Sequence, residues 1–485
     1  MRKRLFALVA IFTLVCSLAP SVAFSDEGGD SGALISVEIE IGADGTPVAA
    51  WGEGWRYDAG AGRLTLDAGH AFSLTGAAYT GSTYNNGAIV GGEFSGSVYN
   101  SKAIEGGTFD DYVYNYEGSI VSGGVFNGGN NSVTNYGTIR GGEFNISVDS
   151  SGSIEDGTFN GGAQNYAGGT ISGGTFGGMM FFNSGIIIDG VFDSDTTYNF
   201  GEIRNGTFGK AVESDGGTIS GGTFASTGSV LSYYGGVIAG GTFNGPVSNC
   251  DSDFDPEYNR ATITGGTFTG AVANHDTIED GTFLGNVTNA GTIEGGFFAL
   301  PVIEQGGVTN ACVYPVSATL TGLSIAEAED AKLVATYEKD SDEGNRLTLV
   351  ADEGYALPDA ISVRCGTADG PQLVTSVDYA YDAASGAIAI KKGSVAGPLF
   401  VVASGVVADE PPIPPDPTPS TSDPAPAPLS DPSPTGAAAP AVTSRATALA
   451  ATGDGTLPQA ALGIALLSGG ALALCVANRH KRSRR

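Results

Sequence analysis

A short unit, Thr-Ile-x-Gly-Gly-Thr-Phe, recurs along the middle of the chain and limits the folds open to it. Thirteen copies are recognisable, and successive closing phenylalanines are 15 to 25 residues apart. The spacing is too short for a propeller blade or a helical repeat. The copies end at Phe94, Phe109, Phe126, Phe144, Phe159, Phe176, Phe192, Phe208, Phe224, Phe243, Phe268, Phe283 and Phe298. A repeat of this length predicts small structural units stacked on one another.

The residue types within one unit predict very short strands. Thr, Ile, Val and Phe favour pleated, half-buried positions, whereas the recurring glycine pairs exclude a helix. A second half-unit, Val-x-Asn, follows many copies, as in Val98–Asn100 and Val113–Asn115. Gly and Asn tolerate positive φ, so we expect both to form the corners of each coil. Ile, Phe and Val are expected to point inward and to stack on their counterparts in adjacent coils.

The predicted architecture is therefore all-β, with a parallel β-solenoid (β-helix) over residues 81–310. At a strand spacing of about 4.8 Å per coil, thirteen coils would form a rod of roughly 60 Å. One coil cannot be stable alone, so many coils must stack on one another. The two terminal coils have a neighbour on one side only and therefore need caps. The repeats resemble those of the parallel β-helix family of bacterial surface proteins. The handedness of the coil stays open.

Residues 26–80 are predicted to form an N-terminal β cap. Residues 54–66 alternate on both sides of a glycine-rich turn, which is typical of a hairpin. Trp55 and Tyr57 in this hairpin either pack in the cap or form a platform for a sugar, and cap packing is the favoured interpretation.

The repeat is lost beyond residue 310, and two further regions follow. Residues 311–405 contain strand-like segments at sandwich spacing, such as Leu347–Leu349 and Ile388–Ile390. They resemble the small β-sandwich modules of Gram-positive surface proteins, which implies an immunoglobulin-like sandwich. Residues 406–448 are rich in Pro, Ala, Ser and Thr, so they are predicted to be a linker without a core.

The N-terminal segment 1–25 has the organisation of a secretory signal peptide. Basic Arg2–Arg4 precede an apolar run, and small residues lead to Ser25. We expect cleavage after Ser25, or alternatively after Ala23. Lipid attachment at Cys16 is a further alternative, although Val15 stands where a small residue is needed.

The C-terminal segment 449–485 has three parts in a fixed order. Leu449, Ala450, Ala451, Thr452 and Gly453 come first, an apolar stretch of about 20 residues follows, and a basic tail closes the chain. The apolar stretch is long enough to cross a bilayer as a helix. The basic tail is expected to stay in the cytoplasm.

This C-terminal organisation resembles the cell-wall sorting signal of Gram-positive surface proteins. The resemblance implies that a sortase cleaves the Thr452–Gly453 bond and joins Thr452 to a peptidoglycan precursor, after a transient stay in the membrane. Ala450 replaces the proline of the commonest motif, and Leu-Ala-x-Thr-Gly resembles the variant of high-GC actinobacteria, so the sortase class stays open. An ordinary transmembrane anchor is the alternative.

Composition restricts partners and chemistry. The net charge of −30 disfavours nucleic acid and anionic lipid as partners. Cys250, Cys312 and Cys365 are far apart and odd in number, which predicts neither a disulfide framework nor a metal site. His70 and His275 stand beside no nucleophile motif. We therefore predict no catalytic residues, cofactor or metal.

Three classes of function agree with this sequence. The favoured one is a cell-wall-anchored surface protein, structural or adhesive, with a host glycan or a matrix protein as the candidate partner. The second is a β-helix that binds or cleaves carbohydrate. The third is an ice-binding solenoid, suggested by a recurring threonine at Thr108, Thr158, Thr175, Thr207, Thr223, Thr242, Thr267 and Thr282.

Overall fold

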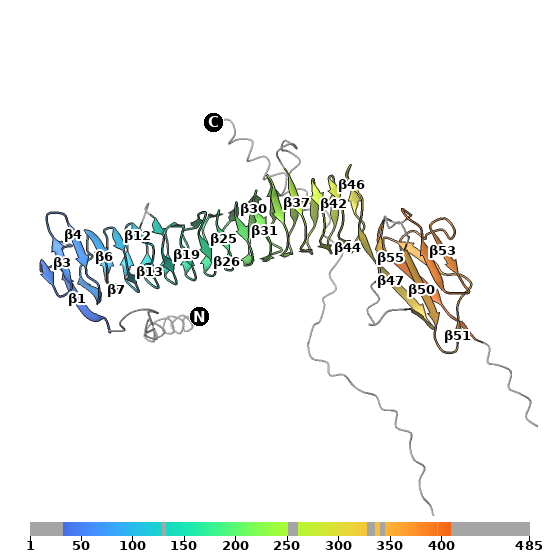
Figure 1. The fold of residues 1–485 in the computed structure, drawn as a ribbon, viewed down its shortest axis with the longest axis horizontal. Coiled ribbons are helices and arrows are strands. Elements are labelled where there is room, and N and C mark those ends of the chain that lie inside the picture. The colour runs from blue at the N-terminus through green and yellow to red at the C-terminus, as the bar shows by residue number, and fades with distance from the viewer. Residues whose placement is uncertain are drawn as a thin grey trace, which may run out of the picture. The chain divides into compact units, whose positions relative to one another are not determined.

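The structure of the protein, a computed structural model, describes residues 33–128, 132–250, 260–326, 335–339, 345–394 and 396–408. The regular elements of these residues are all β-strands, and the strands up to Thr309 form a parallel solenoid of about 14 turns. In each turn the chain passes through three short strands that belong to three different sheets, and the strands of successive turns lie side by side (Figure 1). The predicted parallel β-solenoid is confirmed.

The first sheet, here called the Ile sheet, contains the Thr-Ile half of each repeat. Its 16 strands pair in parallel and in sequence order along the stack. They are β1 (Ile35–Ile41), β5 (His70–Gly76), β7 (Ala88–Gly91), β10 (Ala103–Ile104), β13 (Ile120–Val121), β16 (Thr138–Ile139), β19 (Ser153–Ile154), β22 (Thr170–Ile171), β25 (Ile186–Ile187), β28 (Glu202–Ile203), β31 (Thr218–Ile219), β34 (Gly236–Ile238), β37 (Ala261–Ile263), β40 (Thr277–Ile278), β43 (Thr292–Ile293) and β46 (Val308–Thr309).

The second sheet, the Phe sheet, contains the Thr-Phe half of each repeat. Its strands are β8 (Glu93–Phe94), β11 (Thr108–Phe109), β14 (Val125–Phe126), β17 (Glu143–Phe144), β20 (Thr158–Phe159), β23 (Thr175–Phe176), β26 (Val191–Phe192), β29 (Thr207–Phe208), β32 (Thr223–Phe224), β35 (Thr242–Phe243), β38 (Thr267–Phe268), β41 (Thr282–Phe283) and β44 (Phe297–Phe298). The rings of the closing phenylalanines stack face to face, with centroids 4.5–5.1 Å apart in successive coils. This spacing is that of parallel strands.

The third sheet, the Val sheet, contains the Val-x-Asn half-units. Its strands are β2 (Trp51–Gly52), β3 (Trp55–Asp58), β4 (Arg63–Leu66), β6 (Ser82–Asn85), β9 (Val98–Asn100), β12 (Val113–Asn115), β15 (Val133–Asn135), β18 (Val148–Ser150), β21 (Ala163–Asn165), β24 (Met180–Asn183), β27 (Thr196–Asn199), β30 (Ala211–Asp215), β33 (Val230–Tyr233), β36 (Val247–Asn249), β39 (Val272–Asn274), β42 (Val287–Asn289) and β45 (Ile303–Glu304).

The interior of the solenoid is filled by side chains from all three sheets. The repeat isoleucines and phenylalanines are almost completely buried, as are the valines of the Val sheet. Each inward side chain therefore contacts its equivalents in the coils above and below, which buries a continuous apolar core. The predicted inward direction of Ile, Phe and Val is confirmed.

The asparagines of the Val-x-Asn units differ from the prediction. They do end their strands beside a corner, but positive φ is not the reason for their presence, because the described residues other than glycine that have positive φ are Tyr234, Cys250 and Ser376. Instead, their side chains point inward and are buried. Each amide bonds to the next coil, as in Asn85 Nδ2 to Asn100 Oδ1 and Asn100 Nδ2 to Asn115 Oδ1, both 2.7 Å.

Glycine is required at the corners for two separate reasons. Gly142, the second glycine of its pair, has φ +116°, a conformation that other residues rarely adopt. Gly201, at the corner after a Val-sheet strand, lies so close to the coil below that an added Cβ would be 2.1 Å from the carbonyl oxygen of Gly185. Glycine thus supplies both the turn and the close approach of stacked coils.

The N-terminal strands extend two of the sheets. Strands β1 and β5 pair in parallel in the Ile sheet, and β3 and β4 form an antiparallel hairpin in the Val sheet. The predicted hairpin is confirmed. Trp55 is buried, and the Tyr57 ring packs edge-on against Tyr79 at 6.3 Å. Trp55 therefore packs in the core and offers no platform for a sugar.

Beyond the solenoid, the described residues form two four-stranded sheets and a two-stranded one. Strand β47 (Val313–Thr321) pairs with β49 (Ala335–Glu338) and with β55 (Leu399–Ser404), which pairs with β52 (Ser362–Cys365). The second sheet has the order β48 (Leu323–Ile325), β50 (Asn345–Ala351), β54 (Ala387–Ile390) and β53 (Tyr379–Asp382), and β51 (Tyr355–Ala356) pairs with β56 (Val406–Val407). Strand β44 of the Phe sheet also pairs with β47.

Candidate functional site

The residues predicted for export and wall attachment lie outside the described part of the chain. This holds for Ser25, for Leu449, Ala450, Ala451, Thr452 and Gly453, for the linker beyond residue 408 and for the apolar C-terminal stretch. Within the described residues, no helix is long and apolar enough to cross a membrane. Within the 25-residue step from Phe243 to Phe268, the described residues stop at Cys250 and resume at Arg260.

The two histidines considered for catalysis are not brought together. His70 begins β5 of the Ile sheet, where its Nδ1 lies 3.0 Å from the carbonyl oxygen of Ala68. His275 follows β39 of the Val sheet, many coils further along. Among the described residues, no group of three or more His, Cys, Asp or Glu side chains is arranged to hold a metal ion. Cys250 and Cys312 are buried, and Cys365 is half-buried.

The acidic residues that recur within the repeats have a structural role. In three copies an aspartate replaces the first glycine of the pair, and its carboxylate accepts a hydrogen bond from the next backbone N–H. The distances are 2.8 Å for Asp156 to Gly157, 2.8 Å for Asp189 to Gly190 and 2.7 Å for Asp280 to Gly281. All three carboxylates are exposed. They stabilise a solvated corner of the coil.

Three basic residues of the repeats, Arg140, Arg204 and Lys210, form ion pairs with neighbouring acids. Arg140 binds Glu155 at 2.9 Å, and Lys210 binds Asp195 at 2.8 Å. The hydrogen bond to Asp195 raises the pKa of Lys210, and the Arg204 guanidinium lowers the pKa of Glu202. These pairs are exposed to solvent, so each is worth little to stability.

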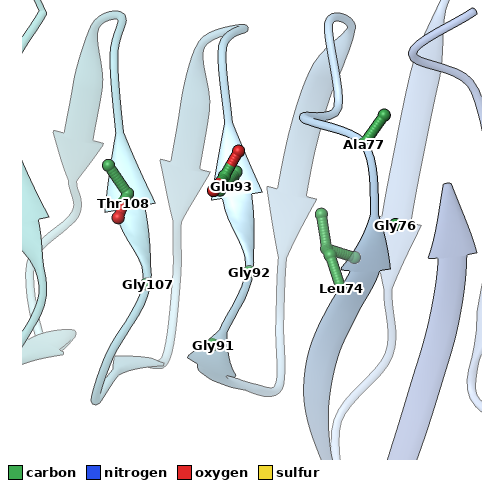
Figure 2. A pocket seen from close by; sticks show the side chains of 8 residues that line it. All are labelled: Leu74, Gly76, Ala77, Gly91, Gly92, Glu93, Gly107 and Thr108. Atoms are coloured by element: carbon green, nitrogen blue, oxygen red, sulfur yellow. The ribbon is translucent and has the colours of Figure 1, made fainter. Parts of the chain in front are cut away.

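A shallow hollow of about 400 Å³ lies near the N-terminal coils, between the Ile and Phe sheets. Figure 2 shows that glycine backbone forms much of its wall, and that the side chains of Glu93 and Thr108 stand next to each other on neighbouring coils. An added Cβ at Gly92 would lie 2.5 Å from the Leu74 Cβ. The hollow is thus a consequence of the glycine corners, and one carboxylate is its only charged group.

The outer threonines of the Phe sheet form a single row with interruptions. Glu93, Val125, Glu143 and Val191 occupy equivalent positions in other coils. The longest uninterrupted run is Thr207, Thr223, Thr242, Thr267 and Thr282. Each two-residue strand presents one outward side chain, so this face of the sheet has a single row of hydroxyls. A regular two-dimensional lattice of hydroxyls would need two parallel rows, and the Phe sheet does not form a second row.

Aromatic side chains gather on the outer face of the Val sheet. The middle residue of Val-x-Asn points outward, and in several coils it is aromatic: Tyr84, Tyr99, Tyr114, Phe182 and Tyr198. Tyr84 stacks on Tyr99 with centroids 4.8 Å apart, and Phe182 stacks on Tyr198 at 5.1 Å. In the sequence these segments are recognisable as short strands, and strand alternation already places their central residues outside.

A second row of aromatics lies at the adjacent corner, directly after the buried asparagines. It contains Tyr116, Tyr136, Tyr166 and Phe200, each 40–47% exposed. The two rows meet at Tyr114, whose ring lies 4.5 Å from that of Tyr116 and 5.4 Å from that of Tyr136. Burial raises the pKa of Tyr114, and the Tyr136 hydroxyl adds to this effect. The phenol is therefore neutral at physiological pH.

The point where the rows meet is hollowed. The hollow measures about 450 Å³ and is lined by Tyr114, Tyr116, Glu117, Tyr136 and Ser151, a set here called the tyrosine cup. A tight turn positions Tyr116 and Glu117, because the Ser119 N–H donates to the Tyr116 carbonyl at 3.1 Å and Gly118 adopts φ +77°. Glu117 is exposed at this turn. In the cup, three aromatic rings and a carboxylate therefore line one hollow.

No protein-family model, curated protein or solved structure matches this chain.

Proposed function

We propose that the chain is an exported surface protein, fixed to a bacterial cell wall at Thr452, whose solenoid acts as a structural or adhesive rod. One structural observation supports a rod-like role. The coils form an uninterrupted parallel stack whose interior is filled by rows of Ile, Phe, Val and Asn side chains. Because this interior is occupied, any ligand must bind to the outer faces. The proposal adds that the C-terminal module is an immunoglobulin-like sandwich, placed between the rod and the linker.

The order of the parts along the chain supports anchoring. The sorting-type motif at Leu449–Gly453 comes directly after the linker, and an apolar stretch and a basic tail follow it. A linker rich in Pro is extended, which would hold the solenoid away from the attachment point. Neither a membrane-spanning solenoid nor a cytoplasmic enzyme needs this order of segments.

The test is cell fractionation of a bacterium that expresses the full chain with its own sortase. Wild-type protein is expected in the wall fraction, released by enzymes that digest peptidoglycan. Thr452→Ala removes the threonine side chain that a sortase recognises beside the scissile bond, so this variant is expected in the membrane fraction or the medium. Ala451→Ser, at the variable position of the motif, is the matched control and should remain on the wall. Wall attachment of Thr452→Ala at the wild-type level would refute the proposal.

A further inference from the structure

We infer that the tyrosine cup is a binding site for an organic cation, either an alkylammonium or a guanidinium group. Its lining consists of three phenol rings, one carboxylate and one hydroxyl. The face of an aromatic ring carries negative electrostatic potential, so it attracts a cation that lies over it. This site does not depend on wall anchoring, and either proposal can fail alone.

The geometry of the rings suits a compact cation. The Tyr114 and Tyr116 rings are tilted by 52° to each other, and the Tyr114 and Tyr136 rings by 32°. Rings tilted in this way form a concave surface, whereas rings stacked in parallel expose their edges. Tyr116 and Tyr136 are 40% and 47% exposed, so a ligand reaches their faces from solvent.

The charges around the cup favour the same ligand. Glu117 is exposed at the rim, and Asp149 stands two residues before Ser151 on the same face of the Val sheet. One carboxylate oxygen of Asp149 is buried and has no hydrogen-bond partner among the described residues. Both carboxylates repel an anion and attract a cation. The net charge of −30 strengthens this preference at long range.

The aromatic face already binds one cation within the chain. The Arg63 guanidinium lies over the Tyr84 ring, with its central carbon 5.4 Å from the ring centroid. This distance is within the range of a cation–π interaction. Tyr84 and Tyr114 occupy equivalent outward positions of the Val sheet, two coils apart. The contact between Arg63 and Tyr84 is thus an internal example of the binding proposed for the cup. The cup offers more rings than Tyr84 alone, and it adds a carboxylate.

A cation of this kind has two chemical sources, and titration calorimetry on the purified full chain distinguishes them. Choline and tetramethylammonium represent a quaternary headgroup, whereas lysine amide and arginine amide represent the side chains of a protein partner. We expect saturable binding of at least one probe. The group of probes that binds more tightly identifies the source of the natural ligand. The uncharged tert-butyl isostere of choline has the same shape and should bind at least about tenfold more weakly.

Variants locate the binding. Tyr136→Ala and Glu117→Gln should each weaken the tightest probe by about three- to tenfold, whereas Tyr136→Phe keeps the ring and much of the affinity. Tyr166→Ala is the matched control, because Tyr166 begins the same kind of turn, with Gly169 N–H donating to its carbonyl at 2.9 Å, but Ala167 stands where the cup has Glu117. Its affinity should equal that of the wild type.

Several results would overturn the inference. These are the absence of cation binding, equal binding of the uncharged isostere, and an affinity that Tyr136→Ala and Glu117→Gln leave unchanged. Binding of a neutral disaccharide that Tyr136→Ala abolishes, without cation binding, would instead identify a sugar site and equally refute the cation. Far-UV circular dichroism of each variant confirms that the solenoid is intact.

Discussion

Buried amides are the residue-level feature that distinguishes this solenoid from a purely apolar stack. Asn115 is fully buried, donates to Asn135 Oδ1 at 2.7 Å, and accepts from Asn100 Nδ2 and from the Ser119 hydroxyl, also at 2.7 Å. Burial of an unpaired amide costs free energy, whereas a fully bonded one is tolerated. The amides therefore specify the register of each coil, because a slipped coil would leave its neighbours unpaired.

Asn115→Ala should lower the free energy of unfolding by about 1–3 kcal/mol, because it removes the Nδ2 donor of Asn135 Oδ1 and one of the two acceptors of Asn100 Nδ2. Denaturant unfolding monitored by circular dichroism measures the change. Asn127→Ala is the control: this exposed asparagine only accepts from Asn145 Nδ2 at 2.9 Å, so its effect should be within about 0.5 kcal/mol. Equal destabilisation by the two variants would show that the buried row of amides has no special role.

At the scale of the strands, the sequence predicted most of the coil but not the function of its polar residues. Thr-Ile and Thr-Phe predict pleated segments because the alternation of apolar residues and the glycine pairs leave few other folds. The inward direction of Asn100 could not be predicted in this way, since an asparagine at a strand end is equally typical of a turn. Its burial follows only from the amide of the next coil, a partner 15 residues away.

The tyrosine cup was missed for a related reason. Tyr114 lies at an outward strand position, which alternation predicts, but Tyr116, Glu117 and Tyr136 come from a turn and from the next coil. Their meeting depends on the register of stacked coils, and that register varies with coil length. The steps of 17 and 18 residues between Phe109, Phe126 and Phe144 reflect extra residues in these coils. The irregular repeats thus indicated where the surface departs from the regular pattern.

Substitution of one stacked phenylalanine measures how much a single strand of the Phe sheet contributes to the stability of the solenoid. Phe159 is fully buried between Phe144 and Phe176, with ring centroids 4.8 and 4.5 Å away. Phe159→Ala should destabilise the solenoid by about 3–5 kcal/mol, because it removes apolar contacts and leaves a cavity. Thr158→Ala, the exposed neighbour in the same strand, should change stability by less than about 0.5 kcal/mol. Thermal and denaturant unfolding of both variants provide the measurement, and a loss for Phe159→Ala as small as for Thr158→Ala would contradict the stacking argument.

At the scale of the whole described chain, the rows of side chains end on caps of different kinds. Asn289 closes the amide row by donating to Glu304 Oε2 at 2.9 Å. The phenylalanine row continues to Tyr314, whose buried ring lies 6.3 Å from that of Phe298. Stacked repeats need such caps because a terminal coil has a neighbour on one side only. The C-terminal module therefore covers the apolar end of the Phe row as well as linking it to the rest of the chain.

A stack whose coils contact only their neighbours should tolerate the loss of one complete coil. Deletion of residues 269–283 removes β39, β40 and β41, one strand from each sheet. The steps from Phe268 to Phe283 and on to Phe298 are both 15 residues, so Phe298 takes the place of Phe283 and Asn289 that of Asn274. We expect an intact β-sheet spectrum, a melting temperature within a few degrees of the wild type, and a solenoid shorter by about 4.8 Å in small-angle scattering.

Deletion of residues 269–276 is the matched control for the coil deletion, because it removes about half a coil. It brings Thr277 directly after Phe268, so β39 of the Val sheet is lost while β40 and β41 remain. The rows of Ile, Phe and Asn then cannot all stay in register, and inward residues are forced toward solvent. We expect a cooperative loss of stability and exposure of apolar surface to a hydrophobic dye. Because the two deletions differ in whether they preserve the coil, equal damage from both would show that the stack behaves as one indivisible core and not as a sum of nearest-neighbour contacts.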